Sequence, residues 1–146
     1  MNILALDVAT KTGFCHDEDS GVWDFSLKRD ESSGMRLIKF GSLLAYTLVE
    51  KEIDLVVFER SAGRHQNAVI VQSELHGVLK HTCETLKVDY RAYSASEIKK
   101  FATGKGNAKK PEMIQACKDN YDINPIDDNE ADAVHIYMLA KRDYPT

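Results

Sequence analysis

Residues 2–14 read NILALDVATKTGF, a short apolar run that ends in one acid and a turn of small residues. The apolar residues from Ile3 to Leu6 predict a strand that is buried on both faces. An ionised carboxylate at the end of such a strand is costly unless a positive group or a ligand meets it. Asp7 is therefore a candidate functional residue, although an aspartate at this point can also cap a turn.

A second run with the same character covers residues 53–60 and reads IDLVVFER. Its nearly continuous apolar residues are typical of a central strand that is covered on both faces. If this strand lies beside the first and parallel to it, Asp7 and Glu59 leave the sheet at the same edge. The alternative is that Glu59 forms a surface ion pair with Arg60 or with a lysine.

The remaining pattern predicts a single α/β domain that covers residues 1–146. Further strands are expected at 13–16, 22–27 and 88–93, and the first two would form an antiparallel meander with the opening strand. Apolar residues at helical spacing predict helices at about 37–51, 68–86 and 96–102, another from 111, and a last one from about 127. Gly77 is expected to mark a close helix approach, and Ser94 with Glu97 matches a capping box.

The last helix carries an acid whose direction can be predicted. At 100° per residue, Asp132 shares a face with His135, Ile136 and Leu139, whereas Glu130 points nearly opposite. Asp132 is therefore expected to face the core. Asp128 lies one turn earlier on the same line, but it could equally be the N-cap of the helix.

Three carboxylates from distant parts of the chain would then meet in one pocket. Their mutual repulsion amounts to several kcal/mol at about 4 Å, so such a cluster needs divalent cations. Oxygen ligands favour Mg²⁺, for which Mn²⁺ can substitute. Two such ions can activate water and stabilise the leaving oxygen in an attack on a phosphodiester.

Charge is uneven along the chain, although its net value is only −4. Residues 91–118 are rich in Lys and Arg, whereas residues 119–132 carry six acids and no base. The segment from Gly104 to Pro111 reads GKGNAKKP and precedes a predicted helix, which is a natural place for phosphates. The alternative is a solvated flexible loop, and a P-loop is excluded because the GxxxxGK[ST] pattern is missing.

Composition excludes several other classes. The sequence contains no apolar run near 18 residues and no signal-peptide pattern, so a cytoplasmic protein without a membrane partner is expected. Its three cysteines lack the spacing of a zinc site or a disulfide framework. The negative net charge argues against a protein that coats nucleic acid without selectivity.

Taken together, these motifs resemble the RuvC family of Holliday-junction resolvases. The resemblance rests on strand-end Asp7 followed by Gly13, on residues 56–59 (VVFE), on residues 93–110 (YSASEIKKFATGKGNAKK) and on residues 130–133 (EADA). It spans nearly the whole chain in the right order and looks most like a phage-type member, so the compartment would be the cytoplasm of a bacterial cell or of a phage-infected host. It implies an RNase H-like fold, with a mixed five-stranded sheet of three antiparallel and then parallel strands flanked by helices.

The resemblance also implies roles for individual residues. Asp7, Glu59 and Asp132 match the metal-binding acids of the family, while Lys99 and Lys110 match its basic residues near the scissile backbone. The family's fourth ligand falls on Asn129 here, which can coordinate through its carbonyl but supplies no charge. Either the site has three acids, or Asp128 substitutes from the adjoining turn as a metal ligand and catalytic acid, and Asp128 is favoured. The residues expected to bind DNA are Lys99, Lys100, Lys105, Lys109, Lys110, Arg64 and His65.

The loop after Glu59 departs from the family, whose members often carry an aromatic residue there that wedges into the junction. Arg64 and His65 occupy this loop, and His65 could stack on a base. Relatives act as homodimers that make paired symmetric nicks, and the helix at 68–86 is the expected dimer interface because of its apolar excess.

Other functions stay open from sequence alone. One is a broader nuclease of the same fold that cuts branched DNA or RNA–DNA hybrids. Another is a non-catalytic relative that binds junctions. A nucleotide-binding module of the actin-like type is disfavoured because the chain is too short and has no second phosphate loop.

Overall fold

The computed structural model describes residues 1–61 and 66–145. Its centre is a five-stranded sheet in the order β3-β2-β1-β4-β5. Strands β1, β2 and β3 are antiparallel neighbours, whereas β1, β4 and β5 run parallel, so the predicted mixed sheet and RNase H-like fold class are confirmed. The strands are β1 (Ile3–Asp7), β2 (Lys11–His16), β3 (Asp19–Asp24), β4 (Leu55–Glu59) and β5 (Asp89–Tyr93).

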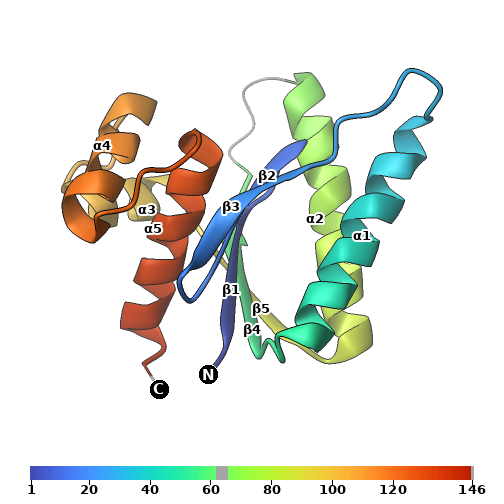
Figure 1. The fold of residues 1–146 in the computed structure, drawn as a ribbon, viewed down its shortest axis with the longest axis horizontal. Coiled ribbons are helices and arrows are strands. Elements are labelled where there is room, and N and C mark those ends of the chain that lie inside the picture. The colour runs from blue at the N-terminus through green and yellow to red at the C-terminus, as the bar shows by residue number, and fades with distance from the viewer. Residues whose placement is uncertain (62–65, 146) are drawn as a thin grey trace.

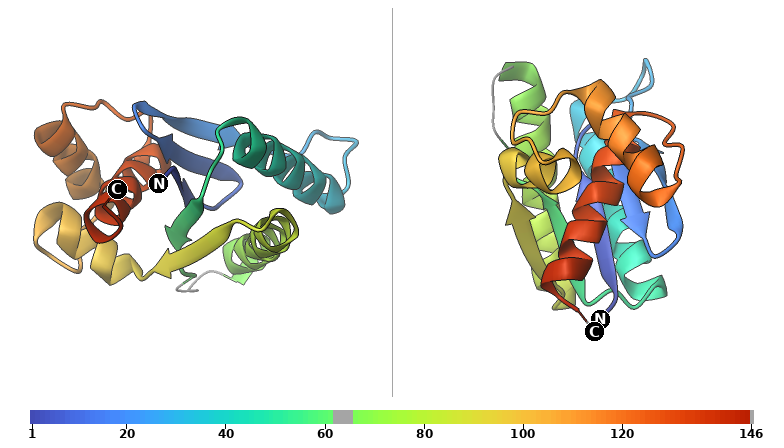
Figure 2. Two further views of the ribbon diagram at one scale, coloured as in Figure 1. Left: turned by 90° about the horizontal axis from the view of Figure 1, so that it is seen from below. Right: turned by 90° about the vertical axis from the view of Figure 1, so that its left-hand side faces the viewer.

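In the described ranges, five helices cover both faces of this sheet (Figures 1 and 2). One face carries α1 (Ser33–Glu50) and α2 (Gln66–Leu86), which lie side by side. The other carries α5 (Asp128–Asp143), with α3 (Ala95–Thr103) and α4 (Lys110–Tyr121) beyond it. The predicted capping box is present at α3, where Ser94 Oγ accepts from the Glu97 amide.

Two hydrophobic cores follow from the alternation of side chains along β1. Ile3 and Ala5 point to the α5 side, whereas Leu4 and Leu6 point to the α1 and α2 side. All four are at most 1% exposed, as expected of a central strand with helices on both faces.

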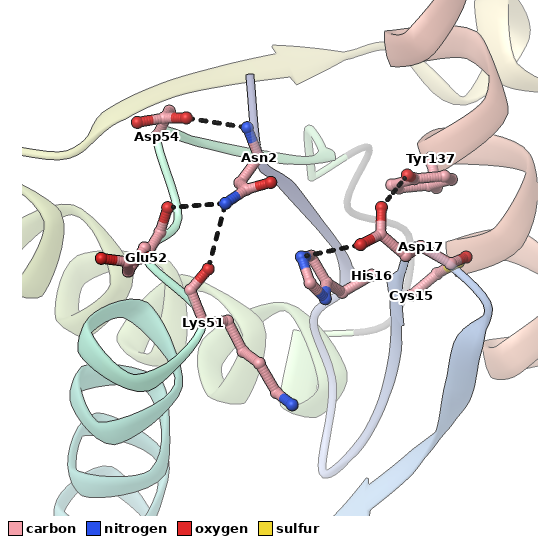
Figure 3. Close-up of polar contacts among 8 residues, drawn as sticks. All are labelled: Asn2, Cys15, His16, Asp17, Lys51, Glu52, Asp54 and Tyr137. Carbon is pink, nitrogen blue, oxygen red and sulfur yellow. Dashed lines mark hydrogen bonds and ion pairs between the residues drawn. The ribbon is translucent and has the colours of Figure 1, made fainter.

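The turn of the β2–β3 hairpin contacts α5 near the amino end of β1, far from the end that carries Asp7 (Figure 3). This turn begins at Asp17, which has a left-handed φ of 53°, and β3 starts at Asp19 rather than at the expected residue 22. The carboxylate of Asp17 accepts a hydrogen bond from the Tyr137 hydroxyl at 2.9 Å. The backbone N–H of Asn2 donates to the Asp54 carboxylate at 2.7 Å, next to the start of β1.

The close helix approach is at Gly41 of α1, not at Gly77. A Cβ on Gly41 would lie 3.0 Å from Val78 of α2, whereas no atom lies within 4 Å of a Cβ placed on Gly77. The Gly77 expectation is therefore wrong, because this glycine is exposed on the outer side of α2. Within the described ranges, the helices are too short or too polar to cross a lipid bilayer.

Candidate active site

Asp7 and Glu59 come from the ends of two parallel neighbouring strands. Asp7 is the last residue of β1 and Glu59 the last of β4, and the register pairs Leu6 with Phe58. Both carboxylates therefore leave the sheet at the same edge. Asp7 is 9% exposed and Glu59 is half-buried.

Helix α5 brings two more acids to this edge. Asp127 is its N-cap, since the Asp127 carboxylate accepts from the Glu130 amide at 2.9 Å. The alternative that Asp128 caps the helix is thus wrong, and the Asp128 side chain is not used as a cap. Asp132 lies one turn further along the same face and is half-buried.

These four acids, Asp7, Glu59, Asp128 and Asp132, are called the acid cluster below. Burial, and then the charges of Asp132, Glu59 and Asp128, raise the pKa of Asp7 well above its usual value. Burial and the charges of Glu59 and Asp128 raise the pKa of Asp132 to about 7. The carboxylates are therefore close enough to repel one another, and their full ionisation calls for positive charge.

Lysines supply part of that charge. An open hollow of about 440 Å³ is lined by Glu59 and Asp132 together with Lys99, Lys109, Lys110 and Met113, among others. Lys99 opposes the rise in pKa of both Glu59 and Asp132, and Lys110 does so for Asp132. The Lys110 ammonium also lies 3.6 Å from an oxygen of Asp128. The hollow thus joins the acid cluster to the basic segment at 104–110.

The other predicted DNA contacts lie elsewhere or cannot be placed. Lys100 lines a separate hollow with Phe101, Leu139 and Arg142, and Lys105 forms an ion pair with Glu112 at 3.4 Å. Arg64 and His65 lie outside the described residues. Of the five predicted contacts that the structure describes, Lys99, Lys109 and Lys110 are therefore the ones next to the acid cluster.

The carboxylates do not already surround a metal position. Among residues 1–61 and 66–145, no three His, Cys, Asp or Glu side chains stand as a preformed metal group. The donor set nevertheless fits Mg²⁺ or Mn²⁺, because it contains only oxygen ligands and its raised pKa values signal uncompensated negative charge. The metal assignment of the acid cluster stays a prediction.

Two residues beside the site, Gly13 and Glu130, have packing roles that the sequence did not indicate. Gly13 pairs with Asp7 across β1 and β2, and a Cβ on it would lie 1.9 Å from the Asn129 carbonyl oxygen of α5. Glu130 is 7% exposed and accepts from the Ser20 hydroxyl at 2.7 Å and from the Ile126 amide at 2.8 Å. The cap at Asp127 could have been found from its spacing to Glu130, whereas these tertiary contacts carry no local signal.

No family model matches the sequence. Among solved structures, RuvC of Thermus thermophilus in complex with a Holliday junction substrate matches with a TM-score of 0.78 and 16% identity, over 98% of this chain and 96% of that one. The chain has the RuvC fold.

Two further structures agree with this assignment. A second Thermus thermophilus RuvC structure gives a TM-score of 0.77 at 16% identity, over 98% of this chain and 97% of that one. The yeast mitochondrial Holliday junction resolvase Ydc2 gives 0.67 at 14% identity, over 97% of this chain and 80% of that one. The RuvC fold therefore extends over nearly the whole chain.

Proposed function

We propose that this chain is a metal-dependent, structure-selective DNA endonuclease that resolves Holliday junctions by paired symmetric nicks. The observation that carries the proposal is the acid cluster on a RuvC fold, in which burial and then neighbouring carboxylates raise the pKa of Asp7 and of Asp132. A purely structural role does not account for it, because uncompensated buried acids destabilise a fold.

Asp7, Glu59, Asp128 and Asp132 would hold two Mg²⁺ ions, and Asp128 would take the place of the family ligand that falls on Asn129. When bound, such ions would supply activation of the attacking water and stabilisation of negative charge on the leaving oxygen. Lys110 lies beside Asp128 and is placed to hold the scissile phosphate. Lys99 lines the same hollow and adds a second positive charge for the DNA backbone.

Lys109, in the basic segment at 104–110, would extend the contact with the DNA backbone away from the acid cluster. The segment starts at Gly104, whose φ of 85° ends α3 in a left-handed residue, and it leads into the N-terminus of α4. Backbone donors and lysines at a helix N-terminus suit phosphate oxygens. Lys100 and Lys105 would contact more distant parts of a branched substrate, because each lies outside the hollow of the acid cluster.

Metal-dependent cleavage of labelled DNA tests this proposal. Wild type is expected to nick a four-way junction in Mg²⁺ faster than a flap, a duplex or an RNA–DNA hybrid. Asp7→Asn should lower the cleavage rate by about 10³-fold or more, because it removes a metal ligand, while junction binding in Ca²⁺ is retained. Asp89→Asn, at the opposite end of the sheet, is the matched control and should cleave as wild type.

Each other outcome has a definite meaning. Equal or faster cleavage of flaps or hybrids would replace junction resolution by a broader nuclease activity. Wild type that binds junctions but cuts nothing in Mg²⁺ or Mn²⁺ would be a non-catalytic relative. Nicks at unrelated positions in opposite strands would contradict the paired symmetric reaction.

A further inference from the structure

His135 is a polar side chain in the apolar core between α5 and α4. It is 0% exposed, and its Nε2 lies 2.8 Å from the Met113 carbonyl oxygen. A carbonyl oxygen only accepts hydrogen bonds, so Nε2 carries the proton and donates. Nδ1 is buried and has no partner among the described residues.

The bond joins two helices that both line the hollow of the acid cluster. Met113 is in the first turn of α4, three residues after Lys110, and it lines the hollow of the acid cluster. His135 is on α5, three residues after Asp132. In the part of the chain that the structure describes, this is the one hydrogen bond between α4 and α5.

Packing alone does not explain a histidine at this place. Neighbouring residues of α5 are apolar, and leucine would fill the core without burying an unpaired nitrogen. Burial also lowers the pKa of His135, which keeps the ring neutral at neutral pH. The ring therefore acts as a donor of one directed hydrogen bond rather than as a charge.

We propose that His135 is a positioning residue, whose bond to Met113 fixes the start of α4 against α5 and so sets Lys110 against the carboxylates of Asp128 and Asp132. The inference rests on the proposed nuclease function. A shift of about 1 Å between reacting groups can lower a rate as much as 100-fold, so one bond of this kind has a measurable effect.

A double-mutant cycle on single-turnover junction cleavage tests the proposal. His135→Leu should lower the rate at least about 10-fold. His135→Gln places its Nε2 donor the same number of bonds from the backbone and should restore the rate to within about 3-fold of wild type. In a Lys110→Ala background the leucine change should matter less than about 2-fold, because the residue that it positions is absent.

The outcomes separate this inference from the proposed function. Equal proportional losses with and without Lys110, or no loss at all, would overturn the positioning role, whereas wild type that cuts no DNA would overturn the nuclease function instead. A readout that needs no activity is the ¹⁵N spectrum of the wild-type imidazole. The proposal requires the neutral Nε2–H tautomer for His135, and an Nδ1–H tautomer contradicts it.

Discussion

At the scale of single residues, the acid cluster places function and stability in opposition. Asp7 is buried, and the charges around it are mostly negative. Asp132 has its pKa raised to about 7 by burial and by Glu59 and Asp128. Without a cation the folded protein therefore favours the protonated acids, whereas the unfolded chain releases these protons near pH 4.

This difference predicts the pH dependence of the stability that the acid cluster contributes in EDTA. Between about pH 4 and 7 the cluster binds more protons in the folded than in the unfolded state, so its contribution to the free energy of unfolding falls as pH rises. His76 and His135, whose pKa values burial lowers, contribute in the opposite direction. The stability that protonated Asp132 supplies is fully present below pH 4 and lost above its folded pKa of about 7. We expect the contribution of Asp132 to fall by a free energy on the order of 2 kcal/mol, measured as the difference in unfolding free energy between wild type and Asp132→Asn in urea at pH 5 and pH 8.

Asp132→Asn isolates the contribution of that carboxyl group. It removes the titrating group and keeps the shape, so the variant should gain stability over wild type as pH rises from 5 to 8. Asp30→Asn, an exposed change in the loop before α1, is the matched control and should keep the wild-type slope. If Asp132→Asn and wild type differed by the same free energy at both pH values, the raised pKa would be contradicted.

Sequence reasoning placed Asp7, Glu59 and Asp132 because each follows from a local rule. The first two end apolar strands, and the third lies on the inner face of a helix. The burial of Glu130 could not be predicted in this way. Helical periodicity correctly points Glu130 away from Asp132, but it does not show that the β2–β3 hairpin covers that side of the helix as well. His76 of α2 is another buried polar residue: it is only 9% exposed and packs on Phe58 at a 5.0 Å centroid distance.

At the scale of elements, the site depends on how closely α5 crosses the sheet. Gly13 of β2 lies under Asn129 in the first turn of α5, and there is no room for a methyl group between them. This contact holds Asp128 and Asp132 next to Asp7, which pairs with Gly13. The small residues Ala131, Ala133 and Ala140 continue the same close packing along the helix.

Gly13→Ala should therefore be strongly destabilising. Its Cβ would lie 1.9 Å from a backbone oxygen, so strand and helix must move apart, at a cost of roughly 3 kcal/mol or more. Gly34→Ala is the matched control, since the space around that glycine is open and alanine favours the first turn of α1. Urea unfolding measures both, and a Gly13→Ala protein as stable as Gly34→Ala would show that α5 does not depend on this contact.

Element types were largely predictable from sequence, whereas contacts between elements were not. The two apolar runs that end in Asp7 and Glu59 predicted the parallel strands β1 and β4, and the capping box predicted the start of α3. The close helix approach was assigned to Gly77, because a glycine inside a helix marks a contact without naming its partner. Gly41 has that role, and only the packing of α1 against Val78 of α2 reveals it.

At the scale of the whole molecule, the two faces of the sheet differ in what they leave exposed. The face with α5, α3 and α4 carries the acid cluster and its lysines. On the other face, Leu75, Leu79 and Cys83 of α2 are buried in the core of the same chain, so much of the apolar surface of this helix is not available to a partner. The exposed apolar residues of this face are mainly on α1, where Ile38, Tyr46 and Val49 are each at least 62% exposed.

A homodimer through the face formed by α1 and α2 fits both the paired nicks and this exposed surface. We expect light scattering to give twice the chain mass at micromolar concentration. Gly77→Arg on α2 and Val49→Glu on α1 each place a charge on this face and should shift the protein to monomer, because a buried unpaired charge opposes association. Lys118→Glu on α4 is the control and should leave the dimer intact.

Each protomer carries its own acid cluster, so loss of the dimer should not abolish cleavage of single strands. A monomeric Gly77→Arg or Val49→Glu protein should still nick single strands of a junction in Mg²⁺, but the two nicks would become independent events. A supercoiled cruciform plasmid distinguishes the cases, since paired nicks give linear DNA and independent nicks give open circles first. Linear product from a monomeric variant, or a monomeric wild type that resolves junctions, would contradict the need for a second copy.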